Sequence, residues 1–196
     1  MIVEHLKQRR LTPGLYSGVW LNEHEDICTF GLWNLSGQLV GFQQYRPLAL
    51  KKINGRPSEA KYFTLLSKVD GKAKLGVFGL DTLDPLNRIV FLVEGIFDAA
   101  PLHQKGANAL ATLTNNPKHL ASWLKSLGYW TVALCEGDNA GKKLATVADE
   151  AIFLPEGLDP GDMPDSWFDQ LLVALRNTYK AKPEHDMAGF LLSPIK

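Results

Sequence analysis

Carboxylates follow three apolar runs in the second half of the chain. Glu94 comes directly after "RIVFLV", Glu136 and Asp138 follow "YWTVALC", and Asp159 follows "AIFLPEGL". Carboxylates that leave water need a partner, and carboxylates that share a site repel one another. A hard divalent cation relieves this repulsion, because Mg²⁺ prefers oxygen ligands and is generally shared with phosphate oxygens. The acids therefore predict a Mg²⁺ or Mn²⁺ site that supports phosphoryl transfer.

The segments around these acids predict a parallel β-sheet. From residue 89 onward, apolar runs alternate with segments of helical character, such as "FDAAPLHQKG" and "PKHLASWLKSLG". Strands that are apolar throughout and alternate with helices form parallel sheets that are covered on both faces. The carboxyl ends of such strands meet at one edge of the sheet. The acids expected to converge at this edge are Glu94, Asp98, Glu136, Asp138 and Asp159.

A simpler interpretation is open for each acid taken alone. Asp98, Asp138 and Asp159 all precede or open turns, where a carboxylate caps a helix and interacts favourably with the helix dipole. Capping explains any one of these positions without a metal ion. It does not explain why all of the acids fall at one edge of the sheet, so we favour the metal site.

Basic residues are concentrated in the first half of the chain. Residues 1–90 contain 12 Lys and Arg against 8 Asp and Glu, whereas residues 91–196 contain 9 against 13. Between residues 42 and 80, only Glu59 and Asp70 oppose eight cations. Such a stretch is either a solvated loop or a surface that binds a polyanion. Beside an acidic pocket we favour a nucleic-acid surface, and the residues expected to form it are Arg46, Lys51, Lys52, Arg56, Lys61, Lys72 and Lys74.

The first half of the chain is predicted to be mixed in structure. Residues 2–10 have helical spacing, and "DICTFGLWN" and "QLVGFQQYR" are β-rich runs joined by a turn at residues 35–37. The segment "KLGVFGL" is expected to form a further short strand. Tyr45 and Tyr62 are each flanked by a cation and are candidates for stacking on nucleic-acid bases. We expect His103 to lie on an exposed face of a helix.

Composition excludes several classes of protein. Apolar residues make up 45% of the chain and charged residues 21%, which is typical of a folded domain. No apolar run approaches the roughly 20 residues of a membrane span, and the N-terminus lacks the pattern of a signal peptide. Cys28 and Cys135 are the only cysteines, and the five histidines lack the spacing of zinc ligands. We therefore expect a cytoplasmic protein with no membrane partner and no zinc.

Three segments of the second half resemble the toprim fold. They are "FLVEGIFDAAPLHQKGANALATLT", "VALCEGDNAGKKLA" and "FLPEGLDPGD". Bacterial-type primases, type IA and II topoisomerases and several nucleases share this fold, with Glu-Gly after its first strand and Asp-x-Asp after its third. Upstream, "GQLVGFQQYR", "KYF" and "GVFGL" resemble the stretch that leads into the toprim portion of DnaG-type primase cores. The resemblance implies an α/β toprim (Rossmann-like) parallel sheet with helices on both faces, preceded by a small mixed α+β basic subdomain.

The resemblance also implies roles for individual residues. The matched catalytic carboxylates are Glu94, Glu136 and Asp138, and the implied metal ligands are Glu94, Asp98, Glu136, Asp138, Asp159 and Asp162. Lys61 matches a basic residue that faces template or nucleotide phosphates, and Arg46 is a looser match. The sequence departs from the family pattern at Glu136, where the family usually has Asp, and at Gly161, where primases often carry an acid.

The resemblance implies a division of the chain and a set of partners. Residues 1–86 are expected to form the basic subdomain, 87–164 the toprim domain, 165–182 a packing helix and 183–196 a flexible tail. The implied ligands are single-stranded DNA or RNA and NTPs. No segment resembles the zinc-ribbon or helicase modules of primases, so we expect a separate helicase or template-recognition protein to supply those functions.

Three functions remain open from the sequence. The first is primase-like, metal-dependent nucleotidyl transfer that makes primers for DNA replication, and it best accounts for the upstream segments. The second is a catalytically degenerate toprim protein that binds nucleic acid or a replication partner, which the Glu at position 136 favours. The third is a toprim nuclease, in which the same acids activate water.

Overall fold

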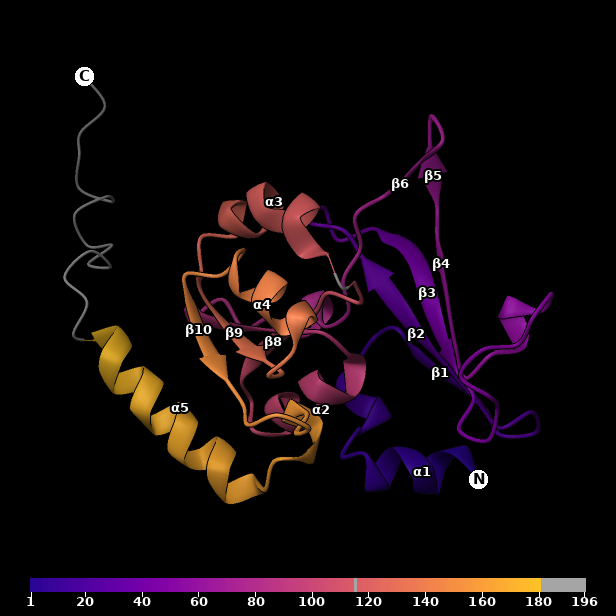
Figure 1. Cartoon of the computed structure of the whole chain (residues 1–196), viewed down its shortest axis with the longest axis horizontal. Helices are drawn as coiled ribbons and strands as arrows, with labels where there is room; N and C mark the ends of the chain where they lie inside the picture. The colour runs from indigo at the N-terminus through magenta and orange to yellow at the C-terminus, as the bar shows by residue number, and fades with distance from the viewer. Residues whose placement is uncertain (115, 181–196) are drawn as a thin grey trace.

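The computed structural model describes residues 1–114 and 116–180 (Figure 1). It consists of an antiparallel sheet from the first half of the chain beside a parallel sheet from the second half. The predicted tail at 183–196 and the last two residues of the predicted packing helix lie outside the described residues. Among the described residues, no helix combines the length and the apolar character that a bilayer crossing requires.

The antiparallel sheet has its four strands in chain order. Their bounds are β1 Val19–Asn22, β2 Ile27–Trp33, β3 Leu39–Tyr45 and β4 Tyr62–Leu66. Strands β2 and β3 form the hairpin predicted around residues 35–37. Alternate side chains such as Phe30 and Tyr45 are buried on the inner face, where α1 (Ile2–Gln8) adds Ile2 and Leu6 to the same core. Beyond β4, the short strands β5 (Lys68–Val69) and β6 (Lys72–Ala73) form a projecting hairpin (Figure 1).

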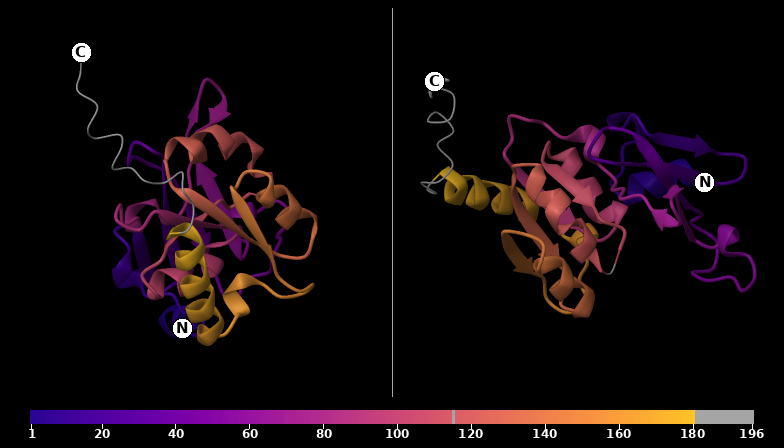
Figure 2. Two further views of the ribbon diagram at one scale, coloured as in Figure 1. Left: turned by 90° about the vertical axis from the view of Figure 1, so that its left-hand side faces the viewer. Right: turned by 90° about the horizontal axis from the view of Figure 1, so that it is seen from above.

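The parallel sheet has the strand order β10–β9–β7–β8. The strand bounds are β7 Ile89–Val93, β8 Asn108–Ala111, β9 Trp130–Cys135 and β10 Glu150–Phe153. Each neighbouring pair is parallel, and every residue of β7 is buried. Burial of the whole strand follows because helices cover both faces of the sheet (Figure 2). The predicted fold class is therefore confirmed.

Each face of the parallel sheet packs against its own apolar core. Val90 and Leu92 pack with residues of α3 (Ala121–Ser126) and α4 (Asn139–Ala145). Phe91 and Val93 pack with residues of α2 (Ile96–Gln104) and α5 (Asp165–Lys180), together with the inner face of the antiparallel sheet. The alternating side chains of one strand thus contribute to both cores. Short 3₁₀ helices connect the main elements, and they are η1 Pro13–Leu15, η2 Pro57–Glu59, η3 Leu80–Thr82, η4 Pro117–Leu120 and η5 Pro160–Asp162.

Residues 77 and 78 join the two sheets. Val77 forms an isolated bridge with Trp33 of β2, and Phe78 forms one with Ala111 of β8. The predicted strand at "KLGVFGL" is therefore wrong in its extent, because the segment crosses from one sheet to the other and pairs with each through a single residue. Phe78 also lies 4.9 Å from Tyr16 and 5.6 Å from Phe30, measured between ring centroids.

His103 is buried, so its predicted position on an exposed helix face is wrong. Its Nε2 lies 2.9 Å from the carbonyl oxygen of Ala109, and its Nδ1 lies 2.9 Å from the hydroxyl oxygen of Tyr16. A carbonyl only accepts, so Nε2 carries the proton and Nδ1 accepts from the Tyr16 hydroxyl. Burial lowers the pKa of His103, which keeps the ring neutral. The ring thus links the N-terminal segment to α2 and β8.

We expect the substitution Tyr16→Phe to lower the free energy of unfolding by about 1–2 kcal/mol, because it leaves a buried imidazole nitrogen unpaired. Urea denaturation followed by circular dichroism measures the change. The control is Tyr129→Phe, because Tyr129 is partly exposed and its ring contact with Arg88 does not need the hydroxyl. Equal losses of unfolding free energy in the two variants would show that the Tyr16–His103 hydrogen bond does not contribute specifically to stability.

Candidate active site

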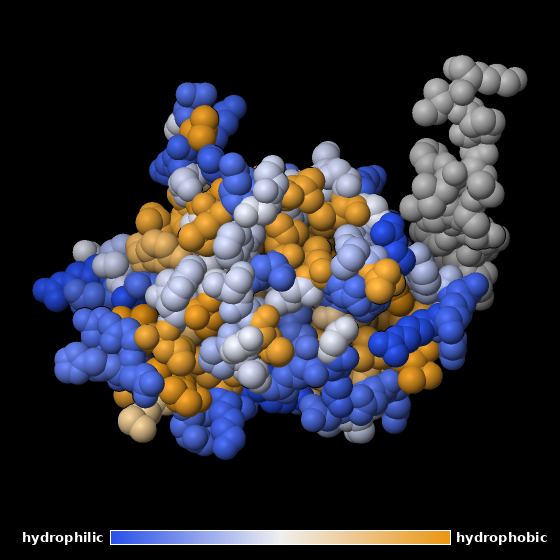
Figure 3. Space-filling view, turned by 180° about the vertical axis from the view of Figure 1, so that it is seen from behind, coloured by the Kyte–Doolittle hydropathy of each residue, from blue (hydrophilic) through white to orange (hydrophobic). Residues whose placement is uncertain are grey.

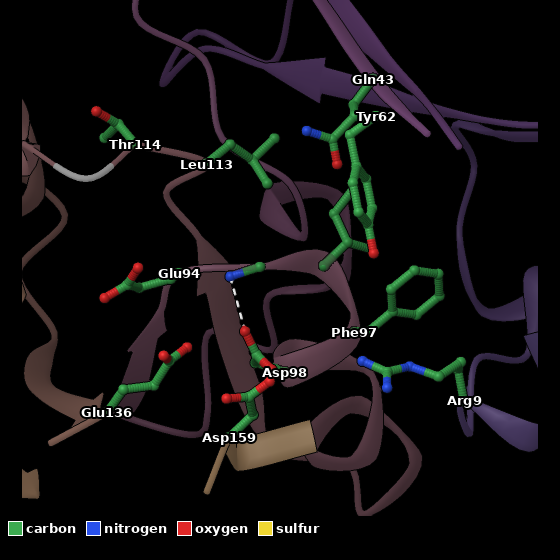
Figure 4. Close-up of a pocket in the computed structure, with 12 residues that line it drawn as sticks. Arg9, Gln43, Tyr62, Glu94, Phe97, Asp98, Leu113, Thr114, Glu136 and Asp159 are labelled. Atoms are coloured by element: carbon green, nitrogen blue, oxygen red, sulfur yellow. Dashed lines mark hydrogen bonds between the residues drawn. The ribbon is translucent and has the colours of Figure 1, made fainter. Parts of the chain in front are cut away.

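A cavity of about 330 Å³ lies where the carboxyl edge of the parallel sheet faces the antiparallel sheet. One wall carries four acids that follow strands β7, β9 and β10, and they are Glu94, Asp98, Glu136 and Asp159. The opposite wall carries Arg9, Gln43, Tyr62 and Phe97, as Figure 4 shows. The predicted convergence of carboxylates at this edge is therefore present for these four acids.

Glu94 follows β7, and its side chain is half-buried in the acidic wall. Its Oε1 is buried and makes no hydrogen bond with the described residues. Burial, followed by the charges of Asp138, Asp98 and Asp159, raises the pKa of Glu94 to about 6. A buried carboxylate oxygen without a donor is the arrangement that a cation would satisfy.

Glu136 follows β9, the strand next to β7, and its carboxylate lies near that of Glu94 (Figure 4). Burial raises its pKa to about 7, and the charges of Asp159, Glu94 and other nearby acids contribute in the same direction. None of the acids of this wall forms an ion pair with a described Lys or Arg. The carboxylates that line the cavity therefore outnumber the cations, because Arg9 is the one Lys or Arg in its lining.

Asp98 is braced by backbone groups. Its Oδ2 accepts a hydrogen bond from the N–H of Gly95 at 2.9 Å, and its Oδ1 accepts one from the N–H of Gly161 at 3.2 Å. Burial raises the pKa of Asp98 to about 6, although the two backbone donors act in the opposite direction. A Cβ at Gly95 would lie 2.9 Å from Oδ2, so glycine permits this close approach. Oδ1 thus helps to hold η5 against α2, and Oδ2 caps the N-terminus of α2 itself.

Asp138 caps α4, as the simpler interpretation of the sequence proposed. Its Oδ1 accepts hydrogen bonds from the N–H groups of Ala140 and Gly141 at 2.9 and 2.8 Å. These bonds leave Oδ2 available, and the charge of Asp138 is the largest contributor to the raised pKa of Glu94 after burial. Asp138 is thus close enough to Glu94 to act on it, although it does not line the cavity. Asp159 precedes η5 and makes no capping bond with its side chain.

Asp162 lies outside the acidic wall. Its side chain is 52% exposed, and its Oδ1 lies 3.7 Å from Nη1 of Arg9. Arg9 in turn lies over the ring of Phe97, 5.0 Å from its centroid, at the rim of the cavity. The neighbouring Arg10 donates to the carbonyl oxygens of Met163 and Gly161 and pairs with Asp165. These contacts fix the end of α1 beside η5 and bring a guanidinium to the cavity.

Arg9 was missed by the sequence analysis, and so was Leu113. Leu113 lines the cavity with a φ of 53°, a left-handed conformation that is uncommon for leucine. Its N–H donates to the carbonyl oxygen of Glu94 at 3.0 Å, which fixes the backbone at the acid. No local pattern identifies either residue as part of a site. The sequence shows that Arg9 and Arg10 are consecutive cations, but not that one of them reaches the cavity.

The predicted nucleic-acid residues occupy four places. Lys61 precedes β4, with its Nζ 6.0 Å from the centroid of the Tyr45 ring, and the next residue, Tyr62, lines the cavity. Arg46 donates to Oε1 of Gln44 at 2.7 Å, on the face of the sheet opposite to the buried Tyr45. The remaining cations lie on two projections, a loop with Lys51, Lys52 and Arg56, and the β5–β6 hairpin with Lys72 and Lys74. The structure therefore brings only Lys61 close to the cavity.

The donor set fits a divalent cation that is shared with phosphate. Among the described residues, no three His, Cys, Asp or Glu side chains are gathered tightly enough to hold a metal ion by themselves. Mg²⁺ usually binds through one or two carboxylates and completes its shell with water and phosphate oxygens. The unpaired oxygen of Glu94 and the uncompensated Glu136 match that requirement.

Comparisons with known proteins identify the fold through solved structures. No protein-family model matches the sequence, and no curated protein matches it. The DnaG catalytic core has a TM-score of 0.56 and 20% identity, and the match covers 86% of this chain and 67% of that chain. The DnaG primase catalytic domain bound to ssDNA has a TM-score of 0.52 and 18% identity, with coverage of 85% and 63%. The Aquifex aeolicus primase, with its zinc-binding and RNA polymerase domains, has a TM-score of 0.56 and 22% identity, with coverage of 90% and 48%.

These matches confirm the predicted resemblance to primase catalytic cores over most of the chain. The chain spans about half to two thirds of the length of the matched proteins. At identities of 22% or less, the likeness is one of fold.

We expect the substitution Glu94→Gln to raise the stability of the metal-free protein at pH 8 by about 1 kcal/mol, after allowance for solvent screening. The folded-state pKa of about 6 exceeds the ordinary value of 4.5, so the ionised form destabilises the fold. This destabilisation is fully present above pH 6 and disappears as the pH falls toward 4.5. Thermal unfolding at several pH values measures the difference between the variant and the wild type.

The control for this prediction is Glu23→Gln, because Glu23 is exposed in a turn and lies in none of the contacts of the cavity. Its stability should follow that of the wild type at every pH. A Glu94→Gln variant that is less stable than the wild type at pH 8 would contradict the view that this carboxylate is held against repulsion.

We expect Gly141→Ala to lower the free energy of unfolding by about 1–3 kcal/mol through overpacking. A Cβ at Gly141 would overlap the backbone carbonyl oxygen of Glu136 and lie 3.1 Å from Cβ of Cys135. The first turn of α4 would have to move, and the capping carboxylate of Asp138 would move with it. Urea denaturation gives the magnitude, and Gly14→Ala is the matched control because no atom lies within 4 Å of the added methyl group. Similar behaviour of the two variants would exclude a tight α4–β9 contact.

Proposed function

We propose that this chain is a primase-like enzyme that joins nucleotides on a single-stranded template in a reaction that depends on a divalent metal ion. The observation that carries the proposal is the acidic wall, in which four carboxylates converge and none forms an ion pair with a described Lys or Arg. It is supported by the likeness of the fold to primase catalytic cores. The reaction would be attack of a 3′-hydroxyl on the α-phosphate of an NTP, with pyrophosphate as the leaving group.

The residues that would hold Mg²⁺ or Mn²⁺ are Glu94, Glu136, Asp138 and Asp159. When bound, such ions polarise phosphate oxygens and stabilise both the attacking and the leaving oxygen of a phosphoryl displacement. Asp98 has a positioning role, because both of its oxygens already accept backbone hydrogen bonds. The longer arm of Glu136, where the family usually has Asp, reaches the cavity from β9.

The opposite wall would orient the nucleotide. Arg9 presents a guanidinium at the rim, and its contact with Phe97 limits the directions in which it can point. Tyr62 is 43% exposed and offers an aromatic face for a base or ribose, with Gln43 beside it as a hydrogen-bonding group. Lys61 would contact phosphates of the template or of the nucleotide. No protein nucleophile is required for this reaction.

We also propose how the chain binds nucleic acid. Residues 1–86 would form the template-binding unit and residues 87–164 the toprim unit. The cations on the two projections would contact the phosphate backbone of single-stranded DNA, or of RNA, without reading its sequence. The likeness to the DnaG catalytic domain bound to ssDNA supports this assignment. A separate helicase or template-recognition protein would direct the enzyme to its start sites.

A second candidate is a binding module without catalytic activity. The observation that favours it is the absence, among the described residues, of three acids gathered closely enough to hold a metal ion alone. In that case the carboxylates would have no function that requires Mg²⁺. The cations on the two projections would still bind the nucleic-acid backbone.

We expect Glu94→Gln and Glu136→Gln each to lower template-dependent NTP incorporation at least a hundredfold in the presence of Mg²⁺ or Mn²⁺. The loss follows because metal-based stabilisation of the transition state is worth several kcal/mol. Incorporation of labelled NTPs on single-stranded DNA, resolved on a denaturing gel, measures it. The control is Glu23→Gln, which is exposed in a turn away from the cavity and should retain activity within about threefold.

The other functions give different results in the same experiment. Cleavage of plasmid or RNA without NTPs, lost in Glu94→Gln, would identify a nuclease and contradict the primase-like proposal. Tight binding to nucleic acid, without incorporation and unaffected by Glu94→Gln, would identify the binding module.

A further inference from the structure

The outer face of the antiparallel sheet carries an apolar groove that no part of the described chain covers. The groove is defined by Leu39, Phe42 and Leu65, and it encloses about 400 Å³. Leu39 and Leu65 are each 50% exposed. Leu39 and Trp20 both lie close to Gly31 on this face, which extends the apolar surface across the sheet. In Figure 3, hydrophobic side chains gather below the projecting hairpin.

Strand β4 forms the open edge of this sheet beside the groove. The N–H of Arg46 donates to the carbonyl oxygen of Lys61, and the N–H of Ser67 donates to that of Val40, which sets the register of the β3–β4 ladder. Hydrogen-bonded and non-bonded pairs alternate in such a ladder, so the N–H and C=O groups of Tyr62, Thr64 and Leu66 point away from β3. No further strand of the described chain follows β4 in the sheet. An open edge of this kind is a template for the pairing of another strand.

Both ends of β4 are flanked by positive charge. The loop before β4 carries Lys51 and Lys52, and its Leu50 bonds to the N–H of Lys61. The hairpin after β4 carries Lys68, Lys72 and Lys74 against Asp70. None of these lysines forms an ion pair with the described residues. The edge is therefore apolar along its length and cationic at its ends.

We propose that this edge binds an extended, acidic segment of a partner protein as an additional strand next to β4. The backbone of that segment pairs with Tyr62, Thr64 and Leu66. Its alternate apolar side chains enter the groove beside Leu65, and acidic residues at its two ends face the flanking lysines. The site is separate from the acidic wall, because Leu65 points to the opposite face of the sheet from Tyr62.

A polypeptide fits this surface better than a nucleic acid does. Aliphatic side chains make up most of the groove lining, and Phe42 is its aromatic member, so the groove offers bases little surface for stacking. The unpaired N–H and C=O groups of an open edge form hydrogen bonds with a second polypeptide backbone, because that backbone presents acceptors and donors at the same spacing. The cations alone would suit either ligand, so the backbone edge decides between them.

The test uses the full chain labelled with ¹⁵N and the synthetic peptide DDITLTVDD, which places apolar residues at alternate positions between acidic ends. We expect saturable binding, with chemical-shift changes and slowed hydrogen exchange at the amides of Tyr62, Thr64 and Leu66. The peptide KKITLTVKK reverses the charge, and the peptide DDSTSTSDD lacks the apolar residues. Each should bind at least tenfold more weakly than DDITLTVDD.

Two matched variants locate the site. Leu65→Ser should weaken the binding of DDITLTVDD at least tenfold, whereas Val173→Ser, at an equally exposed position of α5, should have no effect. Thr64→Pro removes an outward N–H and should also abolish binding, and its spectrum shows directly whether the fold is retained.

Failure of DDITLTVDD to bind, or equal binding by the wild type and Leu65→Ser, would overturn the proposal. An oligothymidylate that shifts the same three amides while the peptide does not would show that the edge is a nucleic-acid surface. Neither result bears on incorporation of NTPs at the acidic wall, so the two proposals fail independently.

Discussion

The carboxylates at the carboxyl edge of the parallel sheet repel one another, and the surrounding fold holds them together against this repulsion. Burial and neighbouring acids raise the pKa of Glu94 to about 6 and that of Glu136 to about 7. A fold selected for stability alone would separate or neutralise these groups. The apolar cores on both faces of the sheet provide the stability that holds them together. Perturbed carboxylates of this kind are typical of functional sites.

The acids of this edge divide into two kinds according to what their oxygens already do. Asp98 uses both oxygens to accept backbone hydrogen bonds, and Asp138 uses one in the same way, so these residues shape the site. Glu94 and Glu136 have no such bonds among the described contacts and carry the chemistry that we propose. Their neighbours supply the support, because the strained Leu113 fixes the backbone carbonyl of Glu94. Positioning and reactivity are thus assigned to different side chains.

The sequence was sufficient to predict the parallel sheet and the positions of four of the six acids expected at the metal site, because the carboxyl ends of parallel strands share an edge whatever the details of packing. It was insufficient wherever a position depends on distant contacts. Arg9 reaches the cavity because Arg10 bonds to Gly161, 151 residues away. His103 is buried because α2 is covered on all sides, so helical spacing carried no sign of an exposed face. An apolar run such as the one around Val77 and Phe78 also does not reveal whether it joins one sheet or two.

The two sheets are attached to each other on both sides of the cavity. On the β8 side, the adjacent residues Val77 and Phe78 pair with different sheets, and on the side of η5, Arg10 holds the N-terminal segment. Two separate attachments oppose hinge motion between the sheets. A ligand that fits the existing space would therefore bind with little rearrangement of the walls.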